Sequence, residues 1–460
     1  MLNKFKKLFQ ATDMTTGEPW KKIVIFTVPM LIGNIAQQLY STVDSIVVGQ
    51  YVGDNALAAV GSAAPILNLL LVLFVGISMG ASIMVAQYFG AKQREELSYT
   101  IGNCILLTGI AVLIIMAVSA VAVWPLLRLL QTPESIIEWC ASYLLIMFLG
   151  SVGSAYYNIL SGVLRGLGDA FSALVYLLVA TVLNIVLDLL FVAKLGMGVS
   201  GVAFATIIAQ AVSAVLCFIR LAKLTDIFDL NIKYLKPNAK YSVNIVKLGL
   251  PSGLTQAIFS MAMIIVQSLT NSFGEMFIAA NVIVMRVDGF AMLPNFSFGT
   301  AMTTYAGQNV GAKAYDRVTK GAKQGTFIAV ATTTTLTALI LIFGKQLMGI
   351  FTNTTELVEL SRNMMGIIAV GYIAMAVTQS LSGVMRGAGD TMTPMWISLF
   401  TTVAVRVPIA YGIAFLTRTP ELPNGRQECI FISLLCSWVI GAIVTTIFYM
   451  RGKWKQKAIS

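Results

Sequence analysis

One stretch of the sequence occurs twice. Residues 161–169 read SGVLRGLGD and residues 382–390 read SGVMRGAGD, which places the copies 221 positions apart. A second set of residues returns at the same offset: Gln87, Gly90, Ala91 and Lys92 correspond to Gln308, Gly311, Ala312 and Lys313. Matches at one common offset indicate that the chain consists of two halves derived from one ancestral unit.

The composition predicts that this unit lies in a membrane. Of the 460 residues, 57% are hydrophobic and 11% are charged, against about 25% charged in an average soluble domain. Twelve apolar stretches are each long enough to cross a bilayer, for which about 20 residues suffice. They cover 22–49, 57–89, 97–125, 136–164, 171–193, 198–220, 243–272, 277–308, 322–344, 356–385, 391–416 and 427–450.

Each half holds six of these stretches. Because six is an even number, both halves enter the membrane from the same side, which is a parallel repeat. We therefore expect an all-α integral membrane protein with twelve transmembrane helices in two parallel-repeat six-helix bundles. The expected domains are an N-terminal lobe (1–220), a cytoplasmic linker (221–242) and a C-terminal lobe (243–460). Residues 4–20 are expected to form a surface helix, and 225–234 an ordinary tether rather than a second one.

The net charge of +11 follows from topology. With both termini inside, the cytoplasmic segments hold 23 Lys or Arg and the outer loops hold 5. Positive charge of this kind marks the cytoplasmic side. The expected location is the cell membrane of a bacterium, multi-pass, with both termini cytoplasmic. Membrane lipids are the expected surroundings, and nucleic acid is excluded as a partner.

Several classes of chemistry are unsupported by the sequence. The chain has no histidine, and its 5 cysteines lack metal-ligand spacing. No GxxxxGK[ST] phosphate loop is present, so ATP is not expected to bind in that way. We expect no enzyme activity, no cofactor and no resident metal. Energy for uphill transport would come from an ion gradient or a separate subunit.

The duplicated stretch ends in an Arg-Gly-x-Gly-Asp corner, at 165–169 and 386–390. Its glycines allow a left-handed helix stop, and its Asp is expected to cap the next helix. Its Arg is expected to bind the end of the preceding helix. A direct role in transport is the alternative.

Six charged residues lie within the apolar stretches: Asp44, Asp188, Asp288, Arg286, Arg362 and Arg406. An ionisable group at a span centre costs roughly 2.5–3.5 kcal/mol on insertion scales, so it marks a functional site by default. The alternative is an ion pair that holds helices together. Arg362 lies near the outer third of its span, from where its side chain could reach the interface.

Two of the carboxylates have no basic residue available within the first six spans. Asp44 shares a helix face with Gln37 and Tyr40, at three- and four-residue steps. Asp188 follows Asn184 by one helical turn. Desolvation disfavours the charged form of an unpaired carboxylate. Asp44 and Asp188 are therefore predicted to accept a proton or to bind a cation.

The charged residues within the spans of the second half allow two interpretations. Arg286 and Asp288 are two residues apart, so they face different neighbours. Arg406 could neutralise Asp288, and a substrate-facing role for this set is equally supported. Prolines interrupt the backbone ladder of spans 1 and 7, at Pro29 and Pro251. We expect span 1 to bend at Pro29 as a gate.

These residues together resemble the multidrug and toxic compound extrusion (MATE) family. The motifs that carry the resemblance are Pro29…Gln37-Gln38-Leu39-Tyr40…Val43-Asp44…Val48-Gly49, Arg165-Gly166-x-Gly168-Asp169, Asn184…Asp188, Gly307-Gln308-Asn309-x-Gly311-Ala312 and Arg386-Gly387-x-Gly389-Asp390. The resemblance covers the whole chain. It implies a cation-coupled antiporter, and a cation site in the N-lobe at the positions of Asp44, Asn184 and Asp188.

A sodium-dependent branch of the same family has an acidic residue in span 7, where this chain offers Gln256 and Gln267. The resemblance therefore favours the N-lobe site. The expected function is a monomeric secondary antiporter that exports organic, cationic amphipathic compounds in exchange for H+, or Na+. Expected cavity residues are Gln37, Tyr40, Gln256, Arg286, Asp288 and Arg406. A lipid or lipid-linked precursor flippase is the alternative, and a passive channel is disfavoured by the two-lobe repeat.

Overall fold

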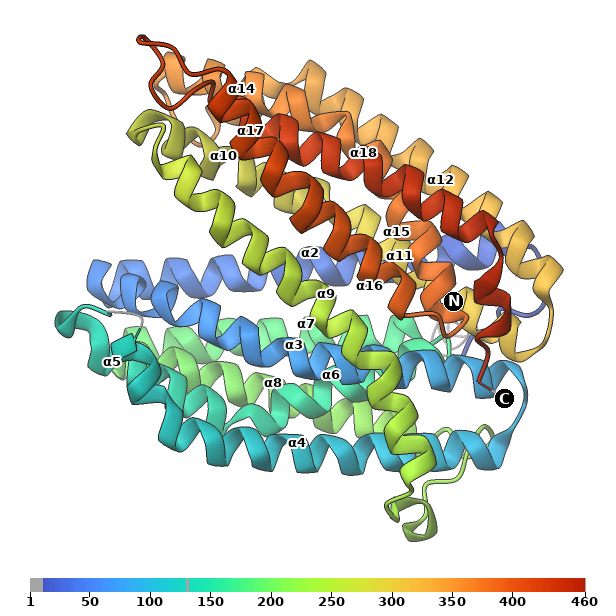
Figure 1. The fold of residues 1–460 in the computed structure, drawn as a ribbon. Coiled ribbons are helices and arrows are strands. Elements are labelled where there is room, and N and C mark those ends of the chain that lie inside the picture. The colour runs from blue at the N-terminus through green and yellow to red at the C-terminus, as the bar shows by residue number, and fades with distance from the viewer. Residues whose placement is uncertain (1–10, 130–131, 460) are drawn as a thin grey trace. The chain divides into compact units, whose positions relative to one another are not determined.

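The structure, a computed structural model, describes residues 11–129 and 132–459, and all regular secondary structure in this part of the chain is helical (Figure 1). Ten helices are long and apolar enough to cross a membrane, and twelve spans result if each of two bent helix pairs counts as one. The expectation of an all-α membrane protein is confirmed. Of the surface helix expected at 4–20, residues 4–10 lie outside the described residues, and 11–18 are not helical.

Each predicted span of the first half corresponds to one helix or one broken helix. The elements are α2 (Pro19–Tyr51), α3 (Asp54–Gly90), α4 (Arg94–Leu129), α5 (Glu134–Leu149), α6 (Ser151–Gly166), α7 (Ala170–Asp188), the π-helical turn η1 (Leu189–Lys194) and α8 (Gly198–Ala222). The helices α5 and α6 meet at a bend of 50°. Gly150 lies at this bend, where a Cβ would come within 2.5 Å of the Ile207 side chain on α8. The bend thus depends on a close helix contact.

The second half repeats this order. A short turn, η2 (Ile232–Leu235), leads into α9 (Ala239–Asn271), α10 (Glu275–Ala291), α11 (Leu293–Gly311), α12 (Tyr315–Ile342), α13 (Gly344–Gly349), α14 (Thr355–Ala369), α15 (Gly371–Gly387), α16 (Met392–Leu399), the π-helical segment η3 (Phe400–Arg406), α17 (Val407–Leu416), α18 (Cys429–Met450) and η4 (Lys453–Gln456). The pair α14 and α15 is bent by 41°, so the break between α5 and α6 also has its repeat.

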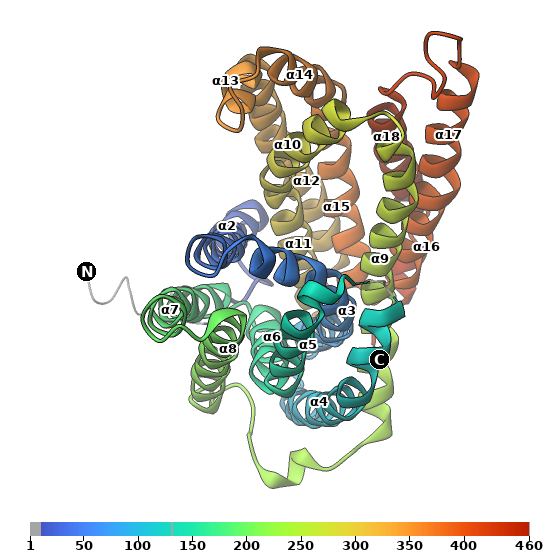
Figure 2. The ribbon, with the colours of Figure 1, turned by 90° about the vertical axis from the view of Figure 1, so that its left-hand side faces the viewer.

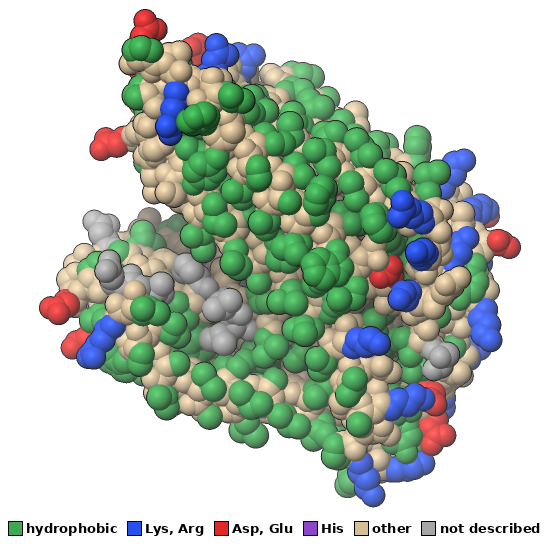
Figure 3. Space-filling model, in the orientation of Figure 1, with side chains coloured by type: hydrophobic (Ala, Val, Ile, Leu, Met, Phe, Trp, Pro, Cys, Tyr) green, Lys and Arg blue, Asp and Glu red, His purple; other side chains and the backbone are tan. Residues whose placement is uncertain are grey.

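The surface agrees with a membrane environment. On the face drawn in Figure 3, hydrophobic side chains cover the helices, and most Lys and Arg side chains gather toward helix ends. Large apolar side chains such as Val121, Leu129 and Ile264 are 70–78% exposed. Exposure of this kind is favourable when hydrocarbon, not water, surrounds the helices.

The contacts of the chain define two compact units. Unit 1 holds Val28–Gly253 with the described residues before Met14, and unit 2 holds Met14–Thr27 with the chain from Leu254 onward. Two helices therefore change unit within their own length. The change in α2 lies next to Pro29, and the change in α9 lies just after Pro251. The lobe boundaries expected at 220 and 243 stay a prediction.

The Arg-Gly-x-Gly-Asp corners have the capping function predicted for their glycine and aspartate. Gly168 and Gly389 have φ of 82° and 97°, in the left-handed region that favours glycine. Asp169 accepts hydrogen bonds from the Ser172 backbone N–H (3.0 Å) and hydroxyl (2.8 Å). Asp390 accepts the corresponding pair from Thr393 (3.3 and 2.8 Å). A cap of this kind contributes about 1 kcal/mol.

The arginine of the corner has a different function from the predicted one. Arg165 donates to the hydroxyls of Ser161 (3.2 Å) and Ser78 (3.4 Å), so it contacts side chains rather than the carbonyls of a helix end. These hydroxyls come from α6 itself and from α3, so the guanidinium contacts side chains of these two helices.

The second repeated motif ends two helices and anchors the N-terminal segment. Lys92 and Lys313 both have positive φ (58° and 57°) just after α3 and α11, as residues that end a helix do. The neighbouring Gln308 accepts a hydrogen bond from the backbone N–H of the fully buried Met14 (2.8 Å), whose carbonyl accepts from Asn309 (3.2 Å). Within unit 2, this motif therefore attaches the segment that precedes α2.

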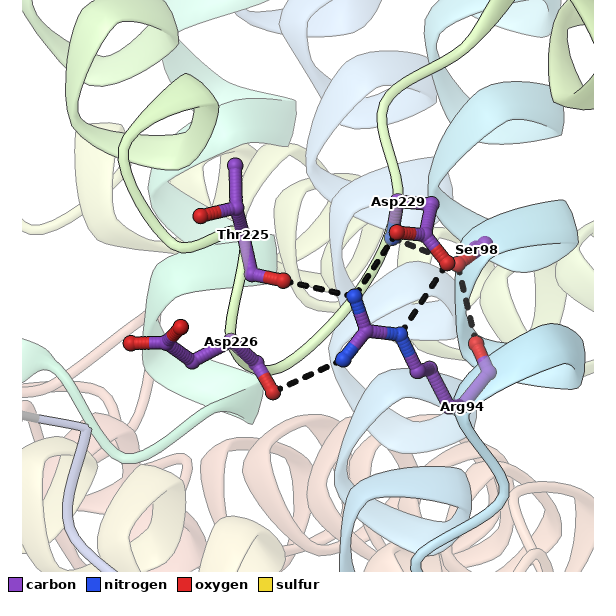
Figure 4. Close-up of polar contacts among 5 residues, drawn as sticks. All are labelled: Arg94, Ser98, Thr225, Asp226 and Asp229. Atoms are coloured by element: carbon purple, nitrogen blue, oxygen red, sulfur yellow. Dashed lines mark hydrogen bonds and ion pairs between the residues drawn. The ribbon is translucent and has the colours of Figure 1, made fainter.

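The segment between the halves is attached to α4 (Figure 4). Arg94 forms a 2.7 Å ion pair with Asp229 and donates to the carbonyls of Thr225 (2.6 Å) and Asp226 (3.0 Å). Ser98 accepts from the Asp229 backbone N–H (2.9 Å). Farther along, Asn103 accepts from the Asn238 N–H (2.9 Å). The ring of Tyr99 is stacked on that of Tyr241, with the centroids 5.4 Å apart, and it meets the ring of Tyr234 edge-on at 4.9 Å. The tether is thus fixed to unit 1 along its length.

We predict that Arg94→Ala will release residues 225–229 with little effect on the helices. The variant removes four hydrogen bonds to three residues of the segment at once, so amide hydrogen exchange there should become several-fold faster, as measured by mass spectrometry. Lys233→Ala, which removes the exposed pair of Lys233 with Glu95 (3.3 Å), is the matched control and should leave this exchange unchanged. Equal exchange in Arg94→Ala and the unmodified protein would show that the contacts do not hold the segment.

The same contact should depend on pH. The hydrogen bond from Arg94 lowers the pKa of Asp229 below its ordinary value. A group whose pKa is lowered by folding stabilises the folded state above its unfolded pKa, about 3.9 for Asp, and loses that effect as the pH falls through the folded value. Protection of the segment should therefore be constant from neutral pH to about 5 and fall only below the ordinary Asp range.

Candidate functional site

Two carboxylates predicted from the sequence to lack a basic partner come together in unit 1. Asp44 lies on α2, and Asp188 is the last residue of α7. Asn184 lies one turn before Asp188, on the same face of α7. With its amide nitrogen facing the acids, Asn184 donates to Asp44 Oδ1 (2.8 Å) and to Asp188 Oδ2 (3.2 Å). One amide therefore bridges two carboxylates from two helices.

The cluster is largely buried, and its negative charges have no ion-pair partner among the described residues. Asn184 and Asp188 are fully buried, and Asp44 is partly buried. No ion pair to either acid occurs among the residues that the structure describes. The Asp188 Oδ1 atom is enclosed without a hydrogen-bond partner in this same part of the chain. Two carboxylates this close repel one another unless a proton or a cation lies between them. The arrangement can therefore bind one positive charge.

Two tyrosines border the cluster. Tyr40, predicted to share the face of Asp44, is buried on α2 with its hydroxyl enclosed near Thr206 of α8. Tyr143 of α5 is also buried and lies within electrostatic range of both acids. Sequence reasoning missed Tyr143 and Thr206, because each lies on a helix far from Asp44 in the chain and has no distinguishing neighbour.

The backbone changes geometry at Asp188. The α-helix α7 ends there, and the wider π-helical turn η1 begins at Leu189. Such turns often occur at functional sites, because they re-aim side chains relative to a regular helix. In Figures 1 and 2, α7 lies beside α8, which supplies Thr206. The cluster itself is carried by α2 and α7, and residues of α5 and α8 border it.

Three residues predicted to line a substrate cavity lie outside this cluster. Gln37 is exposed on α2, and its carbonyl accepts from the Ser41 hydroxyl (3.3 Å). In unit 2, Gln256 and Arg286 are exposed on α9 and α10. The structure brings none of these three into the Asp44–Asn184–Asp188 cluster, and their place in a substrate cavity stays a prediction.

The charges of the second half form a separate group in unit 2. Asp288 accepts a hydrogen bond from the Tyr372 hydroxyl (2.9 Å). Arg406, buried at 8% exposure, lies within electrostatic range of Asp288 but forms no ion pair with it within 4.0 Å. Asp288 thus has a hydroxyl partner and a nearby positive charge, whereas the acids of unit 1 have only an amide. Tyr372 was not predicted, because nothing in the sequence relates α15 to Asp288.

A family model and known proteins match this chain. The MatE model matches residues 29–190 and again 251–412, so the two matches follow the internal repeat. The probable multidrug resistance protein YpnP of Bacillus subtilis (strain 168) is 30% identical over 451 residues, covering 97% of this chain and 98% of the relative. The probable multidrug resistance protein YoeA of the same organism is 28% identical over 448 residues, covering 96% and 95%.

Solved structures share the fold over nearly the entire chain. The crystal structure of a MATE protein in complex with MaL6 superimposes with a TM-score of 0.90 at 25% identity, covering 98% of this chain and 100% of that one. An outward-facing multidrug resistance MATE family transporter of the MOP superfamily gives a TM-score of 0.90 at 25% identity, covering 98% and 99%. Because the family model matches both halves and relatives match from end to end, this protein belongs to the MatE family.

Proposed function

We propose that this protein is a multidrug efflux transporter that works as a secondary antiporter, exporting organic, cationic amphipathic compounds in exchange for H+. Na+ is the alternative coupling ion. The Asn184-bridged pair of Asp44 and Asp188, without a basic partner among the described residues, carries this proposal. Relatives named as multidrug resistance proteins support the substrate class.

The chemistry of the cluster favours a small cation over a large one. The amide already occupies one oxygen of each acid, and Asp188 is fully buried. A proton needs no further ligands, whereas a metal ion needs several oxygen atoms around it. No group of three or more His, Cys, Asp or Glu side chains among the described residues is placed to hold a metal ion. The donor set therefore suits H+ best, and Na+ only with added backbone or hydroxyl ligands.

Exchange of cation and substrate requires that each weakens the binding of the other. Such coupling is reciprocal, because it is a single free energy shared by the two sites. Asp44 and Pro29 both lie on α2, so a change of charge at Asp44 acts on the helix that Pro29 interrupts. We propose that loading of the cluster bends α2 at Pro29 and thereby changes access for the substrate.

The interior basic residues support the flippase alternative less well than the antiporter. A lipid-linked precursor with a phosphate would need accessible basic side chains to bind it. Of the two interior candidates, Arg406 is buried and only Arg286 is exposed. We expect both termini and the linker to be cytoplasmic, and we propose that the exchanged compound moves outward, against the entry of the coupling cation.

Transport in proteoliposomes tests the proposed function. The purified protein should move a fluorescent organic cation against its gradient when a proton gradient is imposed. It should do so weakly or not at all with a sodium gradient alone. Export driven only by sodium would change the coupling ion, and transport of neither kind would contradict the proposal.

Loss of either acid should uncouple transport. Asp188→Asn and Asp44→Asn remove the site of the proton but keep side-chain size, so both variants should fold and insert normally. Export in the same assay should fall about 100-fold, the usual scale for loss of a proton-transferring group. If the two acids share one proton, as proposed, the double variant should be little worse than either single.

The matched control is Asp288→Asn, which changes the acid paired with Tyr372 in unit 2. It should retain most proton-driven export. Full export by both variants of unit 1, together with loss in Asp288→Asn, would move the coupling site to the second half.

Pro29→Ala tests the proposed gate. Alanine restores the backbone hydrogen bond that proline removes, so α2 should become straighter and harder to bend. The variant should fold, bind substrate with similar affinity and turn over several-fold more slowly, as measured from initial export rates. Pro251→Ala on α9 is the paired comparison. An unchanged turnover rate in Pro29→Ala would exclude Pro29 from the transport cycle.

A further inference from the structure

A partly enclosed polar cavity lies within unit 2, apart from the groups described above. Residues of α9, α15, α16, η3 and α18 surround it, and it leaves about 40 Å³ for the centres of water-sized atoms or ions. Hydroxyl side chains dominate its wall, among them Thr378, Ser382, Ser398 and Thr402. The one charged residue in the wall is Arg386, from the second Arg-Gly-x-Gly-Asp corner.

The side chain of Arg386 has no partner among the residues that the structure describes. Its Nε atom is enclosed and forms no hydrogen bond. No ion pair involves it, and no carboxylate of the described chain lies close enough to act on it. A guanidinium group keeps its charge at any ordinary pH. The guanidinium is partly buried, and without a counter-charge or a hydrogen-bond partner among the described residues it would be stabilised by an anion.

The internal repeat shows what has changed. In the first half, the equivalent Arg165 donates to the hydroxyls of Ser161 and Ser78. At the offset of 221 residues, Ser161 corresponds to Ser382, but Ser78 corresponds to Gly299. One hydroxyl partner of the arginine is therefore missing in the second half. In the second half, the cavity therefore adjoins the Arg386 side chain, and residues with other hydroxyl groups line the cavity.

We propose that this cavity binds a small inorganic anion of the size of chloride, held by the Arg386 guanidinium and by the surrounding hydroxyl groups. The cavity has room for about three waters by volume, which a single halide ion with one water also fits. A lipid phosphate or an organic anion is larger than this space, so a small inorganic anion fits it better. This site is independent of the cation cluster in unit 1.

The position of the site relates it to the backbone of η3. Thr401 and Thr402 belong to this π-helical segment and line the cavity, and the Thr401 carbonyl accepts from Ser437 of α18 (2.9 Å). Arg406, which faces Asp288, ends the same segment. A bound anion would therefore stabilise the irregular turn that positions Arg406.

Anomalous diffraction tests the site on the unmodified protein. Crystals of the full chain grown in bromide should show an anomalous peak within hydrogen-bonding distance of the Arg386 guanidinium. Bromide is the probe because it replaces chloride and can be told from water. Water-like density beside Arg386, with bromide bound only elsewhere, would overturn the proposal.

Thermal unfolding gives a second readout. At constant ionic strength, replacing gluconate by chloride should raise the unfolding temperature of the purified protein along a saturating curve, as expected for a ligand of the folded state. Arg386→Gln should lose this chloride response, and Thr402→Val should shift it to higher chloride concentration. Arg165→Gln, the repeat-related control, should retain it. An identical response in Arg386→Gln and the unmodified protein would refute the site.

Gly299→Ser provides a converse variant. It supplies the hydroxyl that Ser78 provides in the first half, with a Cβ placed 3.2 Å from the Gln379 carbonyl, a contact that needs only a small shift. The new hydroxyl should partner Arg386 and weaken the chloride response. If Arg386→Gln does not fold, this variant and the bromide experiment decide the proposal. An undiminished response in Gly299→Ser would contradict the idea that the missing hydroxyl creates the site.

Discussion

A charge enclosed among apolar helices needs a partner, and this requirement organises the polar groups of the protein. The arginine of the first corner finds serine hydroxyls, and the aspartate of that corner finds a helix N-terminus and Arg220 (2.9 Å). Both groups thus have hydrogen-bond partners within the protein. Because loss of one partner would leave the other buried and unsatisfied, the Asp169 cap is a fixed point of the fold, and Asp390 forms the corresponding cap in the second copy of the sequence.

The groups left incomplete are those that a ligand can complete. Asp44 and Asp188 share one neutral amide and carry two acids, so they lack positive charge. Arg386 lacks negative charge. Asp288 lies between these cases, since a tyrosine hydroxyl satisfies one oxygen and Arg406 balances the charge from a distance. The degree of internal compensation therefore separates structural charges from candidate binding sites better than their depth in the spans does.

The sequence predicted those features that depend on local patterns. The apolar stretches gave the spans to within a few residues, because membrane crossing constrains length and hydropathy directly. Turn chemistry gave the caps at Asp169 and Asp390, because a cap involves residues three apart. The face shared by Asn184 and Asp188 followed from helical periodicity. Each of these inferences requires only neighbours along the chain.

Contacts between distant helices could not be predicted, because they join residues that are far apart along the chain. Tyr372 reaches Asp288 from a helix 84 residues away, and Asn103 holds the linker across 135 residues. The linker was expected to be an ordinary tether, because its own composition does not show that Arg94 of α4 binds it. The repeat supplied one long-range clue that local patterns could not. Since Ser78 and Gly299 occupy equivalent positions, a single missing hydroxyl distinguishes a satisfied arginine from an unsatisfied one. In a duplicated protein, differences between the halves therefore identify where one half has acquired a property that the other lacks.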